Sequence, residues 1–196
     1  MTTRRFYQHR INTIAELQQL PFDVGLEFDL RSDGGDVLIT HDPFTTGPTI
    51  EAFFAHIGPR PCIFNVKCEG IEARVLEVAA RHGIADFFLL DLSAPAAWKL
   101  AQQGETRLAV RWSEVEPLAG VLAWQGRAQW VWIDCFTHFP GTRAEWQRLQ
   151  RDFKLCVVSP ELQRHAPDAT RALLAQLQDK PFDAVCSKQR ALWQAP

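Results

Sequence analysis

Two acidic residues and two histidine-containing segments lie in the first quarter of the chain. The acidic segment Glu27-Phe28-Asp29 is preceded by His9-Arg10 and is followed, twelve residues after Asp29, by His41-Asp42. Apolar residues alternate with the acids over residues 25–30, so on a strand both carboxylates leave by one face. Neighbouring carboxylates repel each other unless a cation lies between them, and Mg²⁺ and Ca²⁺ are the hard ions that take oxygen ligands. The pattern therefore predicts a divalent cation site at Glu27 and Asp29.

His9 and His41 add groups that titrate near neutral pH, where an imidazole can accept or donate a proton. An isolated Glu-x-Asp is more often a pair of solvated charges, and a single histidine is more often a surface residue than a catalyst. Together, in register with the acids, these residues form a cluster of titratable groups that is typical of a catalytic site.

The composition is that of a globular protein. The chain has 196 residues, enough for one well-buried domain, with 46% hydrophobic and 22% charged residues. A net charge of −2 argues against a general nucleic-acid binder. We expect no membrane insertion, because no run reaches the length of a membrane span and no apolar segment follows Arg4-Arg5 to make a secretory signal. The five scattered cysteines suit reduced thiols and a cytoplasmic location.

Short strand-like runs alternate with helix-like runs along the whole chain. The expected strands are 5–9, 25–31, 62–67, 87–92, 108–112, 130–136, 155–158 and 183–186, with a hairpin-like extension at 37–40. The expected helices are 12–20, 49–57, 71–82, 95–103, 117–124, 142–151 and 168–177. About eight strand–helix repeats predict a compact TIM (β/α)₈ barrel that forms a single domain over residues 1–196. A doubly wound open sheet also fits the alternation, but it usually has a glycine-rich first turn, which the segment 9–12 lacks.

Polar side chains gather at the ends of the expected strands. Barrel enzymes build their sites at the carboxyl ends of the strands. The residues at or near those ends are His9, Glu27, Asp29, Asn65, Lys67, Asp91, Arg111 and Asp134.

The order and spacing of these segments resemble the glycerophosphodiester phosphodiesterase family, within the wider group of barrels that includes phosphatidylinositol-specific phospholipase C. That family has a His-Arg-Gly strand end, an Asn-Thr helix start, a Glu-x-Asp strand, a His-Asp pair and a Glu-x-Lys strand. The corresponding stretches here are His9-Arg10-Ile11, Asn12-Thr13, Glu27-Phe28-Asp29, His41-Asp42-Pro43 and Asn65-Val66-Lys67.

The resemblance implies a metal-dependent phosphodiester hydrolase that acts on a small glycerophosphodiester-like or sugar-phosphodiester molecule. His9 and His41 would be the general acid and base, and the resemblance does not say which is which. Arg10 and Lys67 would hold the substrate phosphate. A Mg²⁺ or Ca²⁺ ion would be held by Glu27 and Asp29.

Two departures from the family pattern concern this site. Ile11 stands where the family has glycine, and Asn65 stands where it has a third metal-binding acid. Asn65 can still offer an amide oxygen to a hard cation, and Asp91 could supply the missing charge, so both are candidate metal ligands.

Two other interpretations remain open from the sequence. The resemblance fades to strand and helix rhythm after about residue 70, where the family's closing Thr-Asp pair is Ser187-Lys188. A catalytically degenerate barrel that binds a phosphorylated ligand or a partner protein fits this weakening. A metal-free lyase, in which Arg10 or Lys67 replaces the cation, is a further alternative. The sequence does not indicate an oligomeric state.

Overall fold

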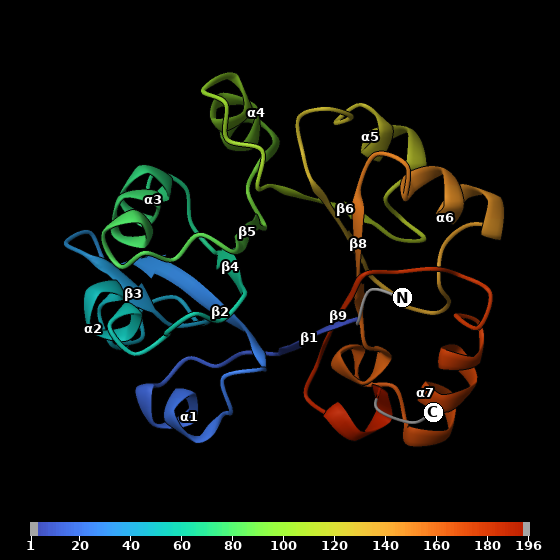
Figure 1. The fold of residues 1–196 in the computed structure, drawn as a ribbon, viewed down its shortest axis with the longest axis horizontal. Helices are drawn as coiled ribbons and strands as arrows, with labels where there is room; N and C mark the ends of the chain where they lie inside the picture. The colour runs from blue at the N-terminus through green and yellow to red at the C-terminus, as the bar shows by residue number, and fades with distance from the viewer. Residues whose placement is uncertain (1–3, 194–196) are drawn as a thin grey trace. The chain divides into compact units, whose positions relative to one another are not determined.

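The computed structural model describes residues 4–193, so the first three residues of the N-terminal segment considered above lie outside the described part. Strands and helices alternate along it (Figure 1). The strands are β1 (Arg5–Gln8), β2 (Gly25–Ser32), β3 (Val37–Ile39), β4 (Cys62–Val66), β5 (Phe87–Leu90), β6 (Ala109–Trp112), β7 (Trp130–Ile133), β8 (Lys154–Val158) and β9 (Ala184–Ser187). The α-helices are α1 (Ile14–Gln19), α2 (Ile50–Phe54), α3 (Glu72–Arg81), α4 (Ala94–Gln102), α5 (Leu118–Leu122), α6 (Arg143–Leu149) and α7 (Pro167–Ala175). Two 3₁₀ helices, η1 (Pro160–Gln163) and η2 (Arg190–Trp193), complete the described elements.

The chain divides into two compact units. The N-terminal unit is Tyr7–Leu100, and the C-terminal unit comprises the described residues 4–6 and 101–193. That residues 1–196 behave as one domain stays a prediction.

The N-terminal unit is built on a parallel sheet. Tyr7 in β1 lies opposite Gly25 in β2, Asp29 in β2 lies opposite Asn65 in β4, and Asn65 lies opposite Leu90 in β5. The short strand β3 pairs with β2 in the antiparallel sense, which confirms the predicted hairpin-like extension. Figure 1 shows α2 and α3 beside each other next to this sheet.

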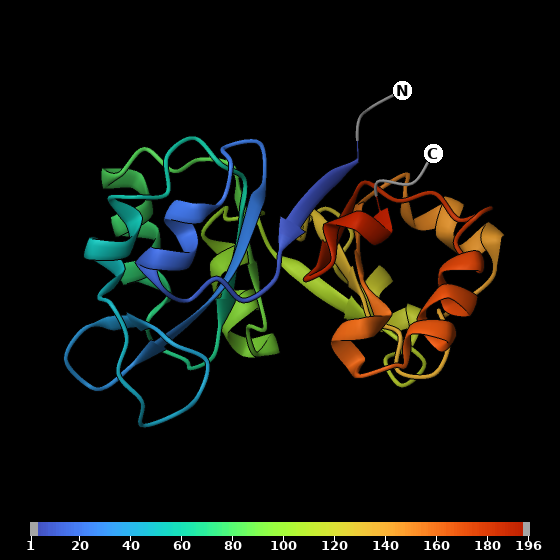
Figure 2. The same cartoon turned by 90° about the horizontal axis from the view of Figure 1, so that it is seen from below.

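The C-terminal unit repeats the pattern. Strands β6, β7, β8 and β9 pair in that order, all parallel. The backbone N–H of Arg5 donates to the carbonyl of Asp183, just before β9, at 2.9 Å. Figures 1 and 2 show α6 and α7 on the same side of β8. The described strands thus follow the order β5-β4-β2-β1-β9-β8-β7-β6, with β3 as an antiparallel addition, and the predicted alternation of parallel strands with helices is confirmed.

Local sequence explains where helices begin. Thr13 accepts the N–H of Glu16, and Glu16 reaches back to the N–H of Thr13, which makes a capping box at the start of α1. Thr142 and Glu145 repeat this arrangement at the start of α6. These reciprocal bonds satisfy N–H groups that have no partner within the helix. The first predicted helix is therefore confirmed, although its regular part is shorter than residues 12–20.

The core of the N-terminal unit lies between the sheet and its helices. The ring of Phe28 packs against Phe53 at 5.0 Å between centroids and against Phe64 at 5.2 Å, and Phe64 stacks on Phe87 at 4.3 Å. All four rings are buried. Because side chains alternate across a strand, Phe28 on the core face places Glu27 and Asp29 on the opposite face. The apolar packing therefore fixes the direction in which the two acids point.

Three strands end earlier than the sequence predicted. β4 ends at Val66, β5 at Leu90 and β7 at Ile133, so Lys67, Asp91 and Asp134 come directly after a strand. The polar residues thus occupy the first positions of the loops rather than the last positions of the strands. Because the backbone is irregular at these positions, their side chains can point in more directions than those of residues within a strand.

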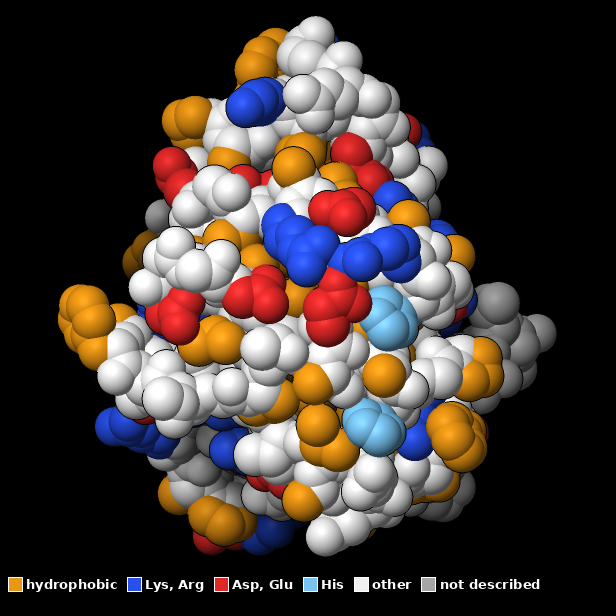
Figure 3. Space-filling model, turned by 90° about the vertical axis from the view of Figure 1, so that its left-hand side faces the viewer, with side chains coloured by type: hydrophobic (Ala, Val, Ile, Leu, Met, Phe, Trp, Pro, Cys, Tyr) orange, Lys and Arg blue, Asp and Glu red, His pale blue; other side chains and the backbone are white. Residues whose placement is uncertain are grey.

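Charges of both signs are mixed over helices α2 and α3. Glu51 accepts from Arg74 at 3.0 Å, pairs with Arg81, and lies 3.0 Å from the His82 imidazole. Figure 3 shows a face of the molecule on which acidic and basic side chains lie side by side.

Within residues 4–193 no helix is both long and apolar enough to cross a bilayer. All five cysteines are free, and all except Cys68 are buried.

Candidate active site

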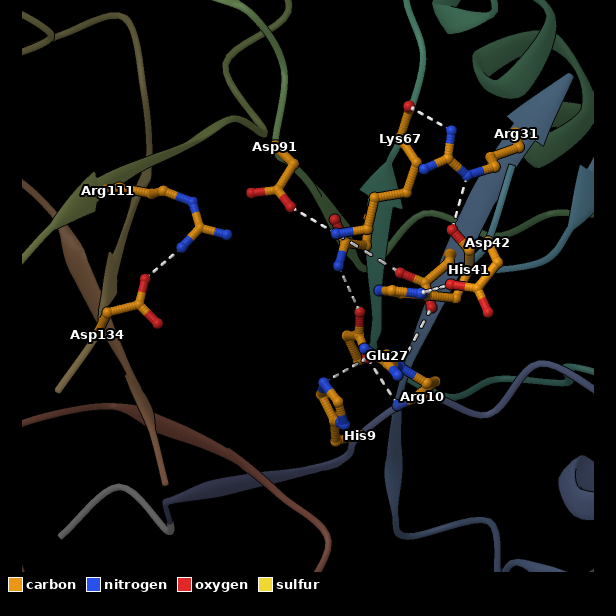
Figure 4. Close-up of polar contacts among 12 residues, drawn as sticks. His9, Arg10, Glu27, Arg31, His41, Asp42, Lys67, Asp91, Arg111 and Asp134 are labelled. Atoms are coloured by element: carbon orange, nitrogen blue, oxygen red, sulfur yellow. Dashed lines mark hydrogen bonds and ion pairs between the residues drawn. The ribbon is translucent and has the colours of Figure 1, made fainter. Parts of the chain in front are cut away.

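The site predicted from the sequence lies within the N-terminal unit, at the carboxyl ends of β1, β2, β4 and β5. Figure 4 shows its side chains converging from these strand ends and from the loop after β3. Glu27 and Asp29 are 0% and 1% exposed, and Asn65 is 7% exposed. Charged groups are rarely buried to this degree without partners, so their partners define the site.

Glu27 is held by hydrogen bonds to both carboxylate oxygens. Asn65 donates from Nδ2 to Oε1 at 2.8 Å, and the backbone N–H of Arg10 donates to Oε2 at 2.6 Å. Burial, followed by the charge of Asp29, raises the pKa of Glu27 to about 7 despite these bonds. The raised pKa shows that burial and the Asp29 charge outweigh the hydrogen bonds and the nearby Lys67 charge at Glu27.

Asp29 is fixed by Asn12 at two points. The Asn12 side chain donates to Asp29 Oδ2 at 2.9 Å and accepts the backbone N–H of Asp29 at 3.0 Å. Two cations lie further away: Arg10 Nε is 3.8 Å from Oδ2 and Lys67 Nζ is 3.7 Å from Oδ1. The sequence analysis placed Asn12 only at a helix start, whereas its side chain orients a site carboxylate.

Arg10 adopts a left-handed backbone conformation, with φ +56°. This conformation is uncommon for residues other than glycine, and here it accompanies the bond from the Arg10 N–H to Glu27. The next residue, Ile11, is buried, and its N–H donates to the backbone carbonyl of Glu27 at 2.9 Å. Ile11 thus anchors the short connection after β1 with an apolar side chain.

The two histidines take different positions around the acids. His9 Nε2 lies 3.7 Å from Glu27 Oε2, and 17% of the His9 side chain is exposed. His41 follows β3, and its Nδ1 lies 2.7 Å from Asp42 Oδ1. That hydrogen bond lowers the pKa of Asp42, so Asp42 stays ionised and can orient the imidazole of His41. His41 is 36% exposed on its side chain, which leaves its ring accessible.

Arg31 joins the loops that carry His41 and Lys67. Its Nε donates to the carbonyl of His41 at 2.7 Å, and its Nη1 donates to the carbonyl of Lys67 at 3.1 Å. Sequence reasoning missed Arg31. The signal was present, because the alternation that puts Glu27 and Asp29 on one face of β2 puts Arg31 on the same face.

Lys67 and Asp91 form an ion pair, with Nζ and Oδ2 2.7 Å apart. Asp91, one of the candidate metal ligands, is thus brought next to the ammonium of Lys67. Arg111 and Asp134 lie in the C-terminal unit, where they pair with each other and Gln163 donates to Asp134 Oδ1 at 3.1 Å.

The donors around Glu27 suit a hard cation. Within residues 4–193 no group of three or more His, Cys, Asp or Glu side chains is placed to hold a metal ion. The Oδ1 atom of Asn65 is buried and has no hydrogen-bond partner in the described structure. Rotation of the Asn65 amide by half a turn would bring Oδ1 next to Glu27 in place of Nδ2. The amide oxygen and the carboxylate would then repel each other unless a cation lay between them. Two carboxylates with one spare amide oxygen therefore fit Mg²⁺ or Ca²⁺.

A cavity of about 420 Å³ lies in the N-terminal unit, between the end of β2 and the loop that follows β3. Its wall combines Arg31, Asp42, hydroxyl groups such as that of Thr45, and apolar side chains including Leu38 and Phe44. Phe44 is fully exposed. A cavity of this size and mixed lining can receive a small polar molecule that also has an apolar part.

Comparison with solved structures identifies the fold. The structure resembles a glycerophosphodiester phosphodiesterase from Agrobacterium tumefaciens, with a TM-score of 0.71 over 98% of this chain and 100% of that one, at 17% sequence identity. The chain has the fold of these phosphodiesterases. The predicted (β/α)₈ barrel is thereby confirmed.

A second phosphodiesterase shares this fold. It is a glycerophosphoryl diester phosphodiesterase from Parabacteroides distasonis, with a TM-score of 0.61 over 96% of this chain and 84% of that one, at 11% identity. No protein-family model matches the sequence, and no curated protein is significantly similar to it. The phosphodiesterase fold is therefore preserved here at very low sequence identity.

Proposed function

We propose that this chain is a phosphoric diester hydrolase that cleaves a small glycerophosphodiester-like or sugar-phosphodiester molecule. One observation carries the proposal: the buried pair Glu27 and Asp29 lies among groups that phosphodiester cleavage needs, on the fold of known phosphodiesterases. Cleavage requires charge neutralisation at the phosphoryl oxygens, a base for the attacking oxygen and an acid for the leaving alkoxide.

Glu27, Asp29 and Asn65 would hold the divalent cation, Mg²⁺ or Ca²⁺. When bound, the ion supplies positive charge that polarises the phosphoryl group. The chain itself prepares for this ion, because Asn12 fixes Asp29 and the Arg10 N–H fixes Glu27. Preset carboxylates of this kind lose little conformational freedom when a ligand binds.

His9 and His41 would share proton transfer, one as general base and the other as general acid. Asp42 keeps Nδ1 of His41 engaged at 2.7 Å, so the Nε2 atom is the one presented for proton exchange. Arg10 and Lys67 would bind the phosphate oxygens. A guanidinium and an ammonium group supply fixed positive charge for this contact.

The cavity lined by Arg31 and Asp42 would receive the part of the substrate beyond the phosphate. Its hydroxyl groups suit a polyol, and Leu38 and Phe44 offer apolar contact. We also propose a cytoplasmic location, because the free cysteines show no disulfide framework among the described residues.

A metal-free cleavage is the second candidate function, and a specific observation favours it. Lys67 Nζ and Arg10 Nε both approach the Asp29 carboxylate, at 3.7 and 3.8 Å, so the protein places its own cations next to the acid pair. In that case Lys67 and Arg10 would neutralise the phosphate without a bound ion.

A turnover assay separates these candidates. Purified protein is incubated with a panel of glycerophosphodiesters and sugar phosphodiesters, and phosphomonoester or cyclic products are followed by ³¹P NMR. Turnover that a chelator abolishes and Mg²⁺ or Ca²⁺ restores supports the metal-dependent hydrolase. Turnover that survives the chelator supports the metal-free reaction. A protein that binds phosphate but cleaves no diester supports the non-catalytic barrel.

A further inference from the structure

Lys67 and Asp91 occupy equivalent positions after neighbouring parallel strands. Lys67 is the first residue after β4, and Asp91 is the first after β5. The register pairs Asn65 with Leu90, so both loops start at the same edge of the sheet. The two side chains meet there, with Nζ 2.7 Å from Oδ2 (Figure 4).

The ammonium of Lys67 lies between two carboxylates at unequal distances. It is 2.7 Å from Asp91 and 3.7 Å from Asp29. The shorter distance is that of a charge-assisted hydrogen bond, and the longer one is outside that range. Asp91 is therefore the closer partner of the ammonium, and the hydrogen bond between them fixes the ammonium beside the acid pair.

Lysine needs such a partner for precise placement. Its ammonium is carried by four methylene groups with many rotamers, so an unrestrained lysine occupies a fixed position only at an entropic cost. The side chains of Lys67 and Asp91 are 19% and 18% exposed, so water screens their attraction only in part. A largely buried ion pair at this distance restricts the rotamers that the Lys67 side chain can adopt.

The backbone of Asp91 supports this arrangement. Asp91 has φ +63°, in the left-handed region that few residues other than glycine adopt. Asparagine and aspartate tolerate this conformation better than other side chains, so an amide can replace the carboxylate without added backbone strain.

We infer that Asp91 is a positioning residue that holds the Lys67 ammonium toward the substrate phosphate, and that it is not a ligand of the divalent cation. This inference rests on the proposed function for the role of Lys67. It assigns the third place at the cation to Asn65, and it gives Asp91 a role in phosphate binding that is exerted through Lys67.

A double-mutant cycle tests the inference in the intact protein. The variants are Asp91→Asn, Lys67→Met and the double variant, and the readouts are calorimetric affinities for inorganic phosphate and, separately, for Mn²⁺. We expect Asp91→Asn to weaken phosphate binding by about tenfold, the effect of one charge-assisted hydrogen bond. In the Lys67→Met background Asp91→Asn should change neither affinity by more than about twofold, because its effect passes through Lys67.

Four results would overturn the inference. The first is that Asp91→Asn weakens Mn²⁺ affinity in the Lys67→Met background, and the second is an equal loss of phosphate affinity in both backgrounds. The third is that Asp91→Asn leaves phosphate affinity unchanged, and the fourth is that the unsubstituted protein does not bind phosphate. The control is Asp36→Asn, which removes a carboxylate 3.9 Å from Arg74 in the same unit and should affect neither ligand. Because binding is measured without turnover, failure of the proposed function appears separately, as phosphate binding without diester cleavage.

Discussion

Asn65 donates its amide N–H to Glu27 at 2.8 Å while its own carbonyl oxygen is buried without a hydrogen-bond partner in the described structure. A buried amide oxygen of this kind costs free energy unless something satisfies it. Rotation of the amide toward a cation shared with Glu27 would satisfy it. The relationship between these two residues is therefore the observation that supports the proposed metal site at Glu27, Asp29 and Asn65.

Replacement of Asn65 by aspartate should strengthen cation binding. The variant Asn65→Asp adds a third carboxylate, and we expect Mn²⁺ affinity to rise by about tenfold, measured by titration calorimetry. Without the ion the same variant should be less stable than the parent by about 3 kcal/mol, because a third buried acid then lacks a partner. Asn65→Leu, which has similar size and no oxygen, is the matched control and should lose Mn²⁺ affinity. If Asn65→Leu binds Mn²⁺ as well as the parent, Asn65 is no ligand.

The stability of the metal-free protein should depend on pH through Glu27. Its pKa rises from 4.5 to about 7 on folding, chiefly through burial, so the folded state holds this proton more tightly than the unfolded chain does. The contribution of Glu27 to the free energy of unfolding is then fully present below about pH 4.5, and it is lost as the pH rises through about 7. The loss is on the order of 3 kcal/mol, since each tenfold change in proton affinity corresponds to about 1.4 kcal/mol.

Urea unfolding at pH 5 and pH 8, in the presence of a chelator, measures this loss. Mn²⁺ should remove most of it, because a bound cation favours the ionised carboxylate. Glu27→Gln is the control and should show a clearly smaller difference between the two pH values. An equal difference in Glu27→Gln and in the parent would assign the pH dependence to other groups.

Asn12 should matter for the cation site more than for helix α1. Asn12→Ala removes both hydrogen bonds to Asp29. We expect a loss of about 1–3 kcal/mol in unfolding free energy, together with weaker Mn²⁺ binding, because a buried carboxylate loses partners. Thr13→Ala is the neighbouring control. It breaks the capping box of α1 at a cost of about 1 kcal/mol but should leave Mn²⁺ affinity unchanged. Equal effects of the two variants on Mn²⁺ affinity would contradict this role.

Arg31 should support catalysis without binding the ion. Arg31→Met releases the carbonyls of His41 and Lys67 from a shared guanidinium. Loss of alignment of this kind lowers turnover by about tenfold or more, so we expect a lower kcat with Mn²⁺ affinity within about twofold of the parent. Arg74→Met, on the outer ion-pair network with Glu51, provides a control of similar chemistry. An unchanged kcat in a folded Arg31→Met protein would remove Arg31 from the account.

Much of the fold could be predicted because the strands are short apolar runs separated by helices with clear start signals. Phe28 and Phe64 mark strands by their burial, and Thr13 with Glu16 marks a helix start. Strand ends were less predictable. The sequence extended β5 through Leu92, whereas the structure ends it at Leu90, because Asp91 turns into the left-handed region and leaves the ladder.

The site was predicted in outline, and its internal pairing was not. Alternation in β2 indicated that Glu27 and Asp29 share a face, and the order of the segments indicated their neighbours. The partnership of Lys67 with Asp91 depends on which loop positions face each other after β4 and β5, and that requires the register. Asn12 was missed as a partner of Asp29 for the same reason, since seventeen residues separate them.

The central claim, phosphodiester cleavage by a histidine pair, is tested most directly by kcat/KM for His9→Ala and His41→Ala. Each variant is compared with the parent protein on a cleaved glycerophosphodiester, in the presence of Mg²⁺ or Ca²⁺, after circular dichroism has established that it is folded. The account predicts that each substitution lowers kcat/KM by about a hundredfold or more, the contribution of a general acid or base. Full activity in either folded variant would contradict it.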